Sequence, residues 1–348
     1  MKKQLSVIIP TYNRAYVLKY TISLLLDQIT KHQDDVELIV CDNASNDDTN
    51  HIMQELCVSN PFIRFLHYND HVEVGDSIKR SALNANGHYL LLWSDDDIPS
   101  PYLIDTILLY LRNYSGLGCL CFNRIEGYSQ DVLPVKKLYL TRKEFNSFEE
   151  LYDDSASFIE KYFCDMSFMS QNVINTDCWH IGAQYDSNGY YGFEFMIPLL
   201  AGLKNKQCLY LDYPLCIERH PNISNHSYAS KWPLYIYVGI PRILLFLEKI
   251  GIINDWKNCY SNYHYTHSTF VYIQQVYHSF AKKLLEYQSY KEEIVSYQTD
   301  PIRIHFTKIA LSHNCLIRAF SKIEFLFFNC TYWIITKASS IFNKLWRW

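Results

Sequence analysis

The fold is decided by the stretch Tyr89-Leu-Leu-Leu-Trp-Ser-Asp-Asp-Asp97, in which a short apolar run leads directly into three aspartates. An apolar run of this length, preceded by Gly87 and followed by Pro99, is typical of a buried strand. Adjacent carboxylates raise one another's pKa, so a cation is needed to hold them together. Their hard oxygen atoms suit Mg²⁺ or Mn²⁺, which bridge carboxylates to substrate phosphates. The stretch predicts a strand that ends in a metal site, although the acids could instead serve the N-terminus of a helix beginning near Pro99.

Three more apolar runs precede this strand and alternate with segments of helical periodicity. The expected strands lie at residues 5–9, 36–40 and 62–66, and the expected helices lie at 14–31, after Asp47 and Asp48, at 75–86 and from Pro99 onward. Strands that alternate with helices in this way predict an α/β fold. We expect a mostly parallel sheet that is flanked by helices on both faces.

Polar clusters stand where three of these strands end. They are Thr11-Tyr-Asn-Arg14, Asp42-Asn43 and Ser94-Asp-Asp-Asp97. Ligands of open α/β sheets bind beyond the carboxyl ends of the strands. A single acidic strand end is usually a solvated turn, but three that share one edge predict a binding site.

Composition excludes some classes of function and location. The net charge of −4 gives no global attraction to nucleic acid. The 11 cysteines form no C-x-x-C pair, and the N-terminal residues lack the long apolar stretch of a signal peptide. We therefore expect a cytoplasmic protein with free thiols and no nucleic-acid partner.

The three polar clusters belong to longer motifs that resemble a known family. These motifs are Leu5-Ser-Val-Ile-Ile-Pro-Thr-Tyr-Asn-Arg14, Val40-Cys-Asp-Asn-Ala-Ser-Asn-Asp-Asp-Thr49 and Trp93-Ser-Asp-Asp-Asp-Ile-Pro-Ser-Pro101. In this order they resemble the N-terminal motifs of glycosyltransferase family 2, and the resemblance covers about residues 4–225. It implies a GT-A fold and a metal-dependent transfer of a sugar from a nucleotide-sugar donor, with inversion at the anomeric carbon.

The resemblance also implies roles for individual residues at the strand ends. The residues that would bind the donor are Pro10, Thr11, Tyr12 and Arg14 around the nucleotide, Asp42 at the base and Asp95 at the ribose. Asp96 and Asp97 would hold the metal. The chain departs from the family at Ser94, where an acid is common, so the assignment of each acid to its group stays open.

An inverting transfer also needs a base that takes the proton of the acceptor hydroxyl. In the family this base is the second acid of a pair that opens a helix, and Gly189-Tyr-Tyr-Gly-Phe-Glu-Phe-Met-Ile-Pro198 has that context with one acid, Glu194. We expect Glu194 to be the base, with Asp186 as the alternative. The run Ile217-Glu-Arg-His-Pro-Asn-Ile-Ser224 resembles an element that closes over the diphosphate, so Arg219 would pair with phosphate and His220 would be a metal ligand.

The domain organisation follows from where these signals stop. We expect a GT-A domain at 1–230, made of a nucleotide-sugar-binding half (1–117) and an acceptor half (118–230). A helical accessory region should follow at 231–302. Residues 303–348 carry seven Lys or Arg against one Glu, among many aromatic residues. Such a segment suits an anionic membrane surface at the inner face of the plasma membrane, or else a terminal helix docked on the body.

These expectations combine into one function and two rivals. The favoured function is a nonprocessive inverting glycosyltransferase that acts on a lipid-linked or surface-glycan acceptor, since the Gln-x-x-Arg-Trp signature of processive synthases is absent. The first rival is a nucleotidyltransferase of sugar-nucleotide synthesis, but residues 11–14 contain no glycine for a triphosphate loop. The second is a sugar-nucleotide-binding scaffold without catalysis, because Phe195 stands beside Glu194.

Overall fold

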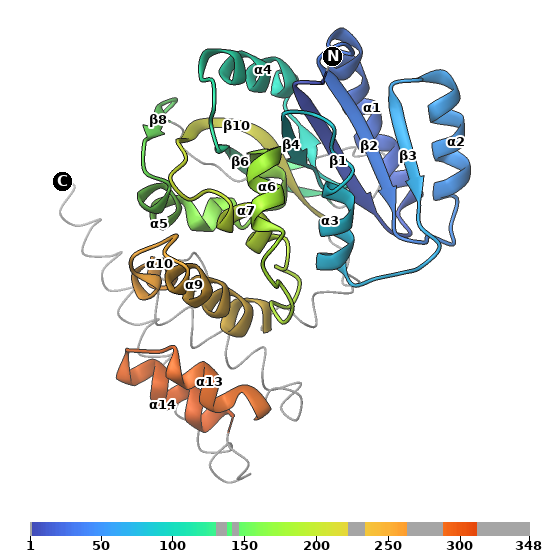
Figure 1. Cartoon of the computed structure of the whole chain (residues 1–348). Coiled ribbons are helices and arrows are strands. Elements are labelled where there is room, and N and C mark those ends of the chain that lie inside the picture. Colours follow the sequence, from blue (N-terminus) through green and yellow to red (C-terminus); the bar gives the residue numbers. More distant parts are fainter. Residues whose placement is uncertain (1, 130–137, 141–145, 222–233, 263–287, 312–348) are drawn as a thin grey trace, which may run out of the picture. The chain divides into compact units, whose positions relative to one another are not determined.

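The computed structural model describes residues 2–129, 138–140, 146–221, 234–262 and 288–311 (Figure 1). The chain forms two compact units, one made of Met1–Tyr235 with Gly239–Tyr263 and the other of Ile236–Val238 with His264–Trp348. The domain boundaries at 230 and 302 that the sequence indicates stay predictions. Each unit is described by itself below.

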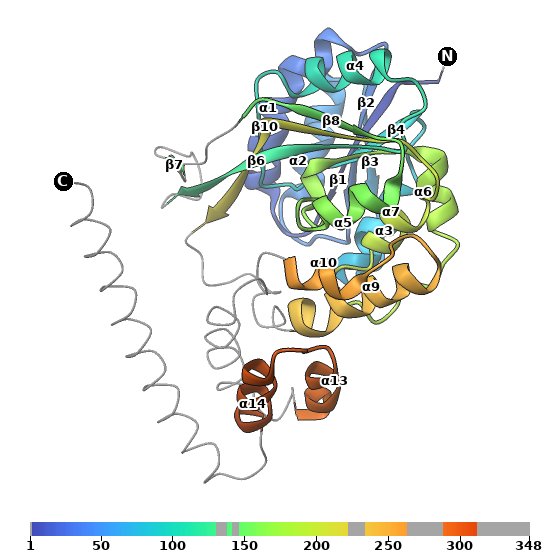
Figure 2. The same cartoon turned by 90° about the vertical axis from the view of Figure 1, so that its left-hand side faces the viewer.

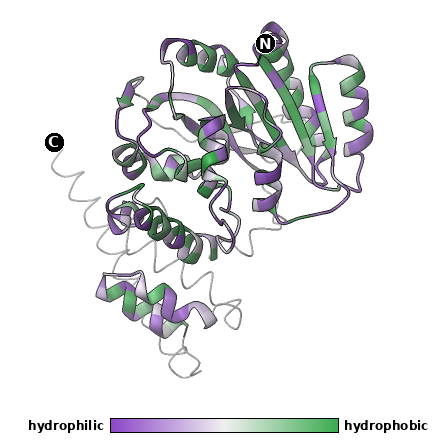
Figure 3. Ribbon diagram, viewed as in Figure 1, coloured by the Kyte–Doolittle hydropathy of each residue, from purple (hydrophilic) through white to green (hydrophobic). Residues whose placement is uncertain are grey.

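The first unit is built on the parallel strands that the sequence predicts. They are β1 (Leu5–Thr11), β2 (Val36–Asp42), β3 (Ile63–His67) and β4 (Tyr89–Leu92). β1 lies between β2 and β4 and runs parallel to both, and β3 is parallel to β2. β1 and β2 are coloured mainly hydrophobic in Figure 3, as expected for strands covered on both faces.

The sheet continues into the second half of the unit through strands that the sequence pattern did not define. In the described residues the order is β3-β2-β1-β4-β9-β6-β10-β5. β9 (Asn172–Asn175) is antiparallel to both β4 and β6 (Cys119–Ser129), whereas β10 (Cys208–Pro221) is parallel to β6. Three short antiparallel strands complete the sheet: β5 (Ile98–Pro99), β7 (Leu138–Leu140) and β8 (Glu149–Tyr152).

The structure corrects one local prediction at the prolines. The helix expected from Pro99 begins only at Leu103, because Ile98 and Pro99 pair with Ile217 and Cys216 as β5. Proline has no N–H to donate, so a short strand at the edge of a sheet is one of the few strand positions that tolerate it.

Helices cover both faces of this sheet (Figure 2). The helices of the first unit are α1 (Ala15–Lys31), α2 (Thr49–Ser59), α3 (Val74–Ala82), α4 (Leu103–Asn113), α5 (Ser155–Met166), η1 (Met169–Gln171), α6 (Thr176–Gly182), α7 (Met196–Ala201), α9 (Ile240–Lys249) and α10 (Trp256–Asn262), and η2 (Tyr235–Gly239) precedes α9. α1, α2 and α4 contribute to one continuous buried cluster with β1, β2 and β4.

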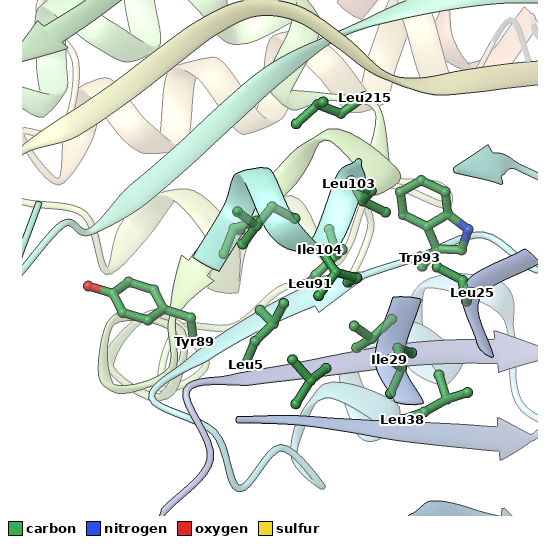
Figure 4. Close-up of a cluster of buried hydrophobic side chains, with 14 of the residues drawn as sticks. Leu5, Leu25, Ile29, Leu38, Tyr89, Leu91, Trp93, Leu103, Ile104 and Leu215 are labelled. Atoms are coloured by element: carbon green, nitrogen blue, oxygen red, sulfur yellow. The ribbon is translucent and has the colours of Figure 1, made fainter. Parts of the chain in front are cut away.

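That cluster fixes the ends of the strands. Leu25 and Ile29 of α1 lie over Leu38 and Leu91 of the sheet, and Figure 4 shows them in one apolar group with Trp93. Trp93 is fully buried and directly precedes the acids. The apolar packing therefore holds the start of the polar segment in one place, because a large buried side chain has few alternative positions.

The described part of the second unit is helical. It contains η3 (Gln288–Tyr290), α13 (Lys291–Ser296) and α14 (Pro301–Ala310). Among the residues that the structure describes, no helix combines the length and the apolar character needed to span a bilayer. The predicted basic aromatic tail at 303–348 lies outside the described residues beyond Leu311. Residues 263–287 of the expected helical accessory region also lie outside them.

Candidate active site

The three predicted polar clusters meet at one edge of the sheet. Thr11 and Asp42 are paired at the ends of β1 and β2, and the backbone N–H of Asn43 donates to the Thr11 carbonyl at 2.9 Å. The Thr11 hydroxyl donates to Asp95 Oδ2 at 2.7 Å, which joins this edge to the segment after β4. Pro10, paired with Cys41 one position earlier, is half-buried. Parallel strands thus bring together residues far apart in the chain.

Arg14 supplies the positive charge beside the acids. Its Nη1 lies 2.5 Å from Asp95 Oδ1 and 3.0 Å from Asp96 Oδ2. The Arg14 side chain is 29% exposed, whereas the Asp95 side chain is 6% exposed. One guanidinium therefore faces two carboxylates from the solvent side, in the position from which it could also meet an anionic ligand.

Asp95 and Asp97 are both buried, and burial raises the pKa of each. For Asp95, the Arg14 charge opposes this effect and the Asp96 charge adds to it. For Asp97, the charges of Asp96 and Glu218 raise the pKa further, against a hydrogen bond from Ser170. The three carboxyl groups thus outnumber the Arg14 guanidinium, which contacts two of them.

This excess of carboxylate oxygen fits a divalent cation in its chemistry. Asp96 Oδ1 accepts from the Ser94 hydroxyl at 2.5 Å, and Asp97 Oδ1 accepts from the Arg219 backbone N–H at 3.4 Å. Within the described ranges, no three His, Cys, Asp or Glu side chains converge into a metal-binding group. The side chain of His220 lies outside the described residues, although its backbone belongs to β10. Asp96 and Asp97 are hard ligands of the kind that Mg²⁺ and Mn²⁺ prefer.

The end of β2 is organised by internal hydrogen bonds. Asp42 is fully buried; its Oδ1 accepts from the Ser45 hydroxyl at 2.5 Å, and its Oδ2 lies 2.8 Å from His67 Nδ1. The more exposed groups here are aromatic. Tyr12 is 41% exposed and its ring centroid lies 4.2 Å from that of His71. The structure thus places Asp42 behind the surface that Tyr12 and His71 present.

The two candidate bases lie in the chain between α6 and α7. Glu194 is partly buried, and its Oε2 accepts from the Gly192 backbone N–H at 2.7 Å. Burial raises the pKa of Glu194, against the backbone hydrogen bonds that it accepts. Asp186 is exposed and accepts from the Asn188 backbone N–H at 3.0 Å. Of the two acids, Glu194 has the environment that suits a general base.

Two supporting groups have no counterpart in the sequence analysis. Ser170 of η1 is fully buried; its hydroxyl accepts from the Ser94 N–H at 2.9 Å and donates to Asp97 Oδ2 at 2.6 Å. Arg124 of β6 donates from Nε to Glu218 Oε2 at 2.6 Å and lies over the Phe168 ring. No local pattern marks either residue, because their partners are distant in sequence.

The fold and this edge define the class of protein. The sheet flanked by helices has the architecture of GT-A glycosyltransferases, and residues 6–172 match the family model Glycosyl transferase family 2. This match covers just under half of the chain and confirms the resemblance to glycosyltransferase family 2 that its three motifs indicate.

Two curated relatives match parts of the chain. Chondroitin synthase from Escherichia coli is 29% identical over 116 residues, which are 33% of this chain and 16% of that enzyme. GalNAc(5)-diNAcBac-PP-undecaprenol beta-1,3-glucosyltransferase from Campylobacter jejuni is 33% identical over 95 residues, which are 27% of this chain and 30% of that enzyme. The matched part of the chain thus spans less than a third of each relative.

Solved structures match a larger part of the chain at lower identity. S. aureus TarS 1–349 has a TM-score of 0.62 at 14% identity, covering 92% of this chain and 90% of that one. Its complex with UDP-GlcNAc has a TM-score of 0.61. Mannosyltransferase PcManGT from Pyrobaculum calidifontis, in complex with GDP-Man and Mn²⁺, has a TM-score of 0.52 at 11% identity, covering 92% and 84%. At these identities the likeness establishes the fold.

Proposed function

We propose that this chain is a nonprocessive, inverting glycosyltransferase that transfers a sugar from a nucleotide-diphosphate sugar to a lipid-linked or surface-glycan acceptor. The observation that carries the proposal is the meeting of Thr11, Arg14 and Asp95 at the strand edge, with two further acids beside them. The family domain supports the same reading. TarS and PcManGT, which share the fold, have solved structures in complex with UDP-GlcNAc and GDP-Man, respectively.

The donor binds along the carboxyl edge of β1, β2 and β4. Tyr12 offers an exposed ring to the nucleoside, and Asp42 supports that end of the site from beneath. Pro10 and Thr11 line the nucleotide, and Asp95 binds the ribose. Arg14 and Arg219 then face the diphosphate, since a guanidinium pairs well with phosphate oxygens.

Asp96 and Asp97, with His220, are the residues that would hold a divalent cation. When bound there, Mg²⁺ or Mn²⁺ would neutralise the negative charge that develops on the departing diphosphate. Asp97 is kept in place by Ser170, and Asp96 by Ser94. The assignment is supported by the position of buried Asp97 near the charges of Asp96 and Glu218, which a bound cation would offset.

Glu194 removes the proton from the acceptor hydroxyl. The hydroxyl oxygen forms a bond to the anomeric carbon while the bond from that carbon to the diphosphate oxygen breaks, on the opposite face. The proton passes to a Glu194 carboxylate oxygen, and the configuration at the carbon is inverted. Burial raises the pKa of Glu194, which brings its basicity closer to the working pH.

The acceptor and location are inferred from two further features. The Campylobacter relative is named for an undecaprenol-linked substrate. The composition of residues 303–348 suits an anionic surface, so we place the protein in the cytoplasm, peripheral at the inner face of the plasma membrane.

A donor screen tests the proposal. Thermal unfolding of the full chain should be measured with UDP-, GDP-, dTDP- and CDP-sugars, with and without Mn²⁺, because a ligand of the folded state raises its apparent stability. One donor should raise the melting temperature, and the same donor should yield an inverted product when a lipid-linked acceptor is added. If no donor changes the melting temperature and none is consumed, the proposal is wrong.

A further inference from the structure

Two glycines enclose the carboxylate of Glu194. Gly192 donates its N–H to Oε2 at 2.7 Å and has a φ of 94°, a conformation that side chains disfavour. Gly75, the second residue of α3, lies so close that a Cβ there would be 2.0 Å from Glu194 Oε2 and 2.8 Å from its Cδ. The Glu194 carboxylate thus occupies space that exists because Gly75 lacks a side chain, whereas a Cβ at Gly192 would instead meet the Tyr235 ring at 2.9 Å.

The segment that carries Glu194 is attached to α3 at a second point. Lys79 Nζ donates to the Ser187 hydroxyl at 2.7 Å and lies 2.8 Å from Asp76 Oδ1. Lys79 stands four residues after Gly75, so both contacts fall on the same side of α3. α3 therefore contacts this segment at two places, at Ser187 and at Glu194.

α3 is also attached to the end of β2. Arg80 donates to the side chain of Asn43, and its Nη2 donates to the Asp70 carbonyl at 2.9 Å. Its guanidinium lies 3.8 Å from the centroid of the Tyr68 ring. Because Asn43 directly follows Asp42, one helix connects the nucleotide-binding end of the sheet to the segment that carries Glu194.

We propose that Gly75 is a positioning residue, because its backbone contacts the Glu194 carboxylate and limits where that carboxylate can lie. Through this contact, α3 sets the position of the base relative to the donor. This inference rests on the proposed function, because Glu194 acts as a base only if the chain transfers a sugar. A shift of about 1 Å in a reacting group can cost about 100-fold in rate.

A size-compensation cycle in the full chain tests the proposal. The proteins are the wild type, Gly75→Ala, Glu194→Asp and the double variant. Aspartate is one methylene shorter than glutamate, so its carboxylate is withdrawn from the added Cβ, whereas the Cβ of residue 194, 2.8 Å from the added Cβ, remains. We expect Gly75→Ala to lower kcat by about 100-fold with little change in the donor KM. Adding Gly75→Ala to Glu194→Asp should lower kcat by clearly less than Gly75→Ala does in the wild type, because the contact with the carboxylate is already gone.

The pH profile separates positioning from general damage. Gly75→Ala should push Glu194 toward solvent and shift the acidic limb of kcat/KM to lower pH, since burial is what raises the pKa of Glu194. Gly116→Ala is the control, because Gly116 has a φ of 88° and no atom within 4 Å of an added Cβ. This change should strain the backbone without moving the acidic limb of the kcat/KM profile.

The outcomes that overturn the inference are distinct from those that overturn the function. Losses in kcat that multiply in the double variant, or an unmoved acidic limb in Gly75→Ala, overturn it. If Gly75→Ala does not fold, a double variant that folds supports the inference, because the shorter side chain relieves the contact with the carboxylate, and a double variant that does not fold overturns it. A wild type that uses no donor overturns the proposed function itself, and additive melting losses would then show that the two residues share no space.

Discussion

Replacing Ser170 by alanine should destabilise the protein through the acid segment alone. The fully buried hydroxyl accepts from the Ser94 N–H at 2.9 Å and donates to Asp97 Oδ2 at 2.6 Å. A hydrogen bond to a charged group contributes about 1.5–3 kcal/mol, and a neutral one contributes about 1 kcal/mol. Losing both should lower the free energy of unfolding by about 2.5–4 kcal/mol.

The assay is urea unfolding of Ser170→Ala beside a matched control, Ser81→Ala. Ser81 is equally buried, but its hydroxyl donates to the Ser77 carbonyl within α3 at 2.7 Å, so its loss should cost less than about 1 kcal/mol. Ser170→Ala should also weaken Mn²⁺ binding measured by calorimetry without substrate, because the carboxylate of Asp97 loses its orientation. Equal losses in the two variants, with unchanged Mn²⁺ affinity, would refute the reasoning.

Four further predictions follow from other contacts. Glu194→Gln should lower kcat by about 10²–10⁴-fold while the donor-induced melting shift is kept; an unchanged kcat would remove Glu194 from the mechanism. Arg14→Met should weaken donor binding, measured by titration, by about tenfold or more. Arg112 is exposed, and Arg112→Met should leave the donor affinity unchanged. Burial raises the pKa of Glu37, but hydrogen bonds from Ser6, Asn86 and Arg64 bring it below the ordinary 4.5. Its charge therefore stabilises the fold above pH 4.5 and less so as the pH falls through the folded-state pKa, and Glu37→Gln should reduce that loss in urea unfolding from pH 6 to 3. Finally, the full chain should sediment with anionic vesicles at low salt, and glutamine at the seven Lys and Arg positions of 303–348 should prevent this; sedimentation that persists in this variant excludes the electrostatic mechanism.

The sequence predicts well where local pattern and chain order suffice. β1 to β4 and the meeting of Thr11, Asp42 and Asp95 follow from apolar runs and from the rule that parallel strands share one carboxyl edge. The structure confirms these parts of the fold. The helix expected at 75–86 ends earlier, at Ala82, because helix ends are set by local caps that periodicity does not resolve.

The supports of the site could not be predicted, because they depend on distant pairs. Ser170 meets Asp97 only because β9 enters the sheet beside β4, and no periodicity specifies which strand a short segment such as Asn172–Asn175 will pair with. Gly75 looks like an ordinary glycine near the start of a helix. Its contact with Glu194 exists only in three dimensions.

The antiparallel strand β9 has a consequence for how the molecule can diversify. It joins the parallel block that ends in β4 to the block of β6 and β10, and the family match stops at residue 172, where β9 begins. Changes in the loops that follow β9 leave the pairing among β1, β2, β3 and β4 intact. Under the proposed function, the donor-side contacts of Thr11, Arg14 and Asp95 can thus be kept while the loops that receive the acceptor change.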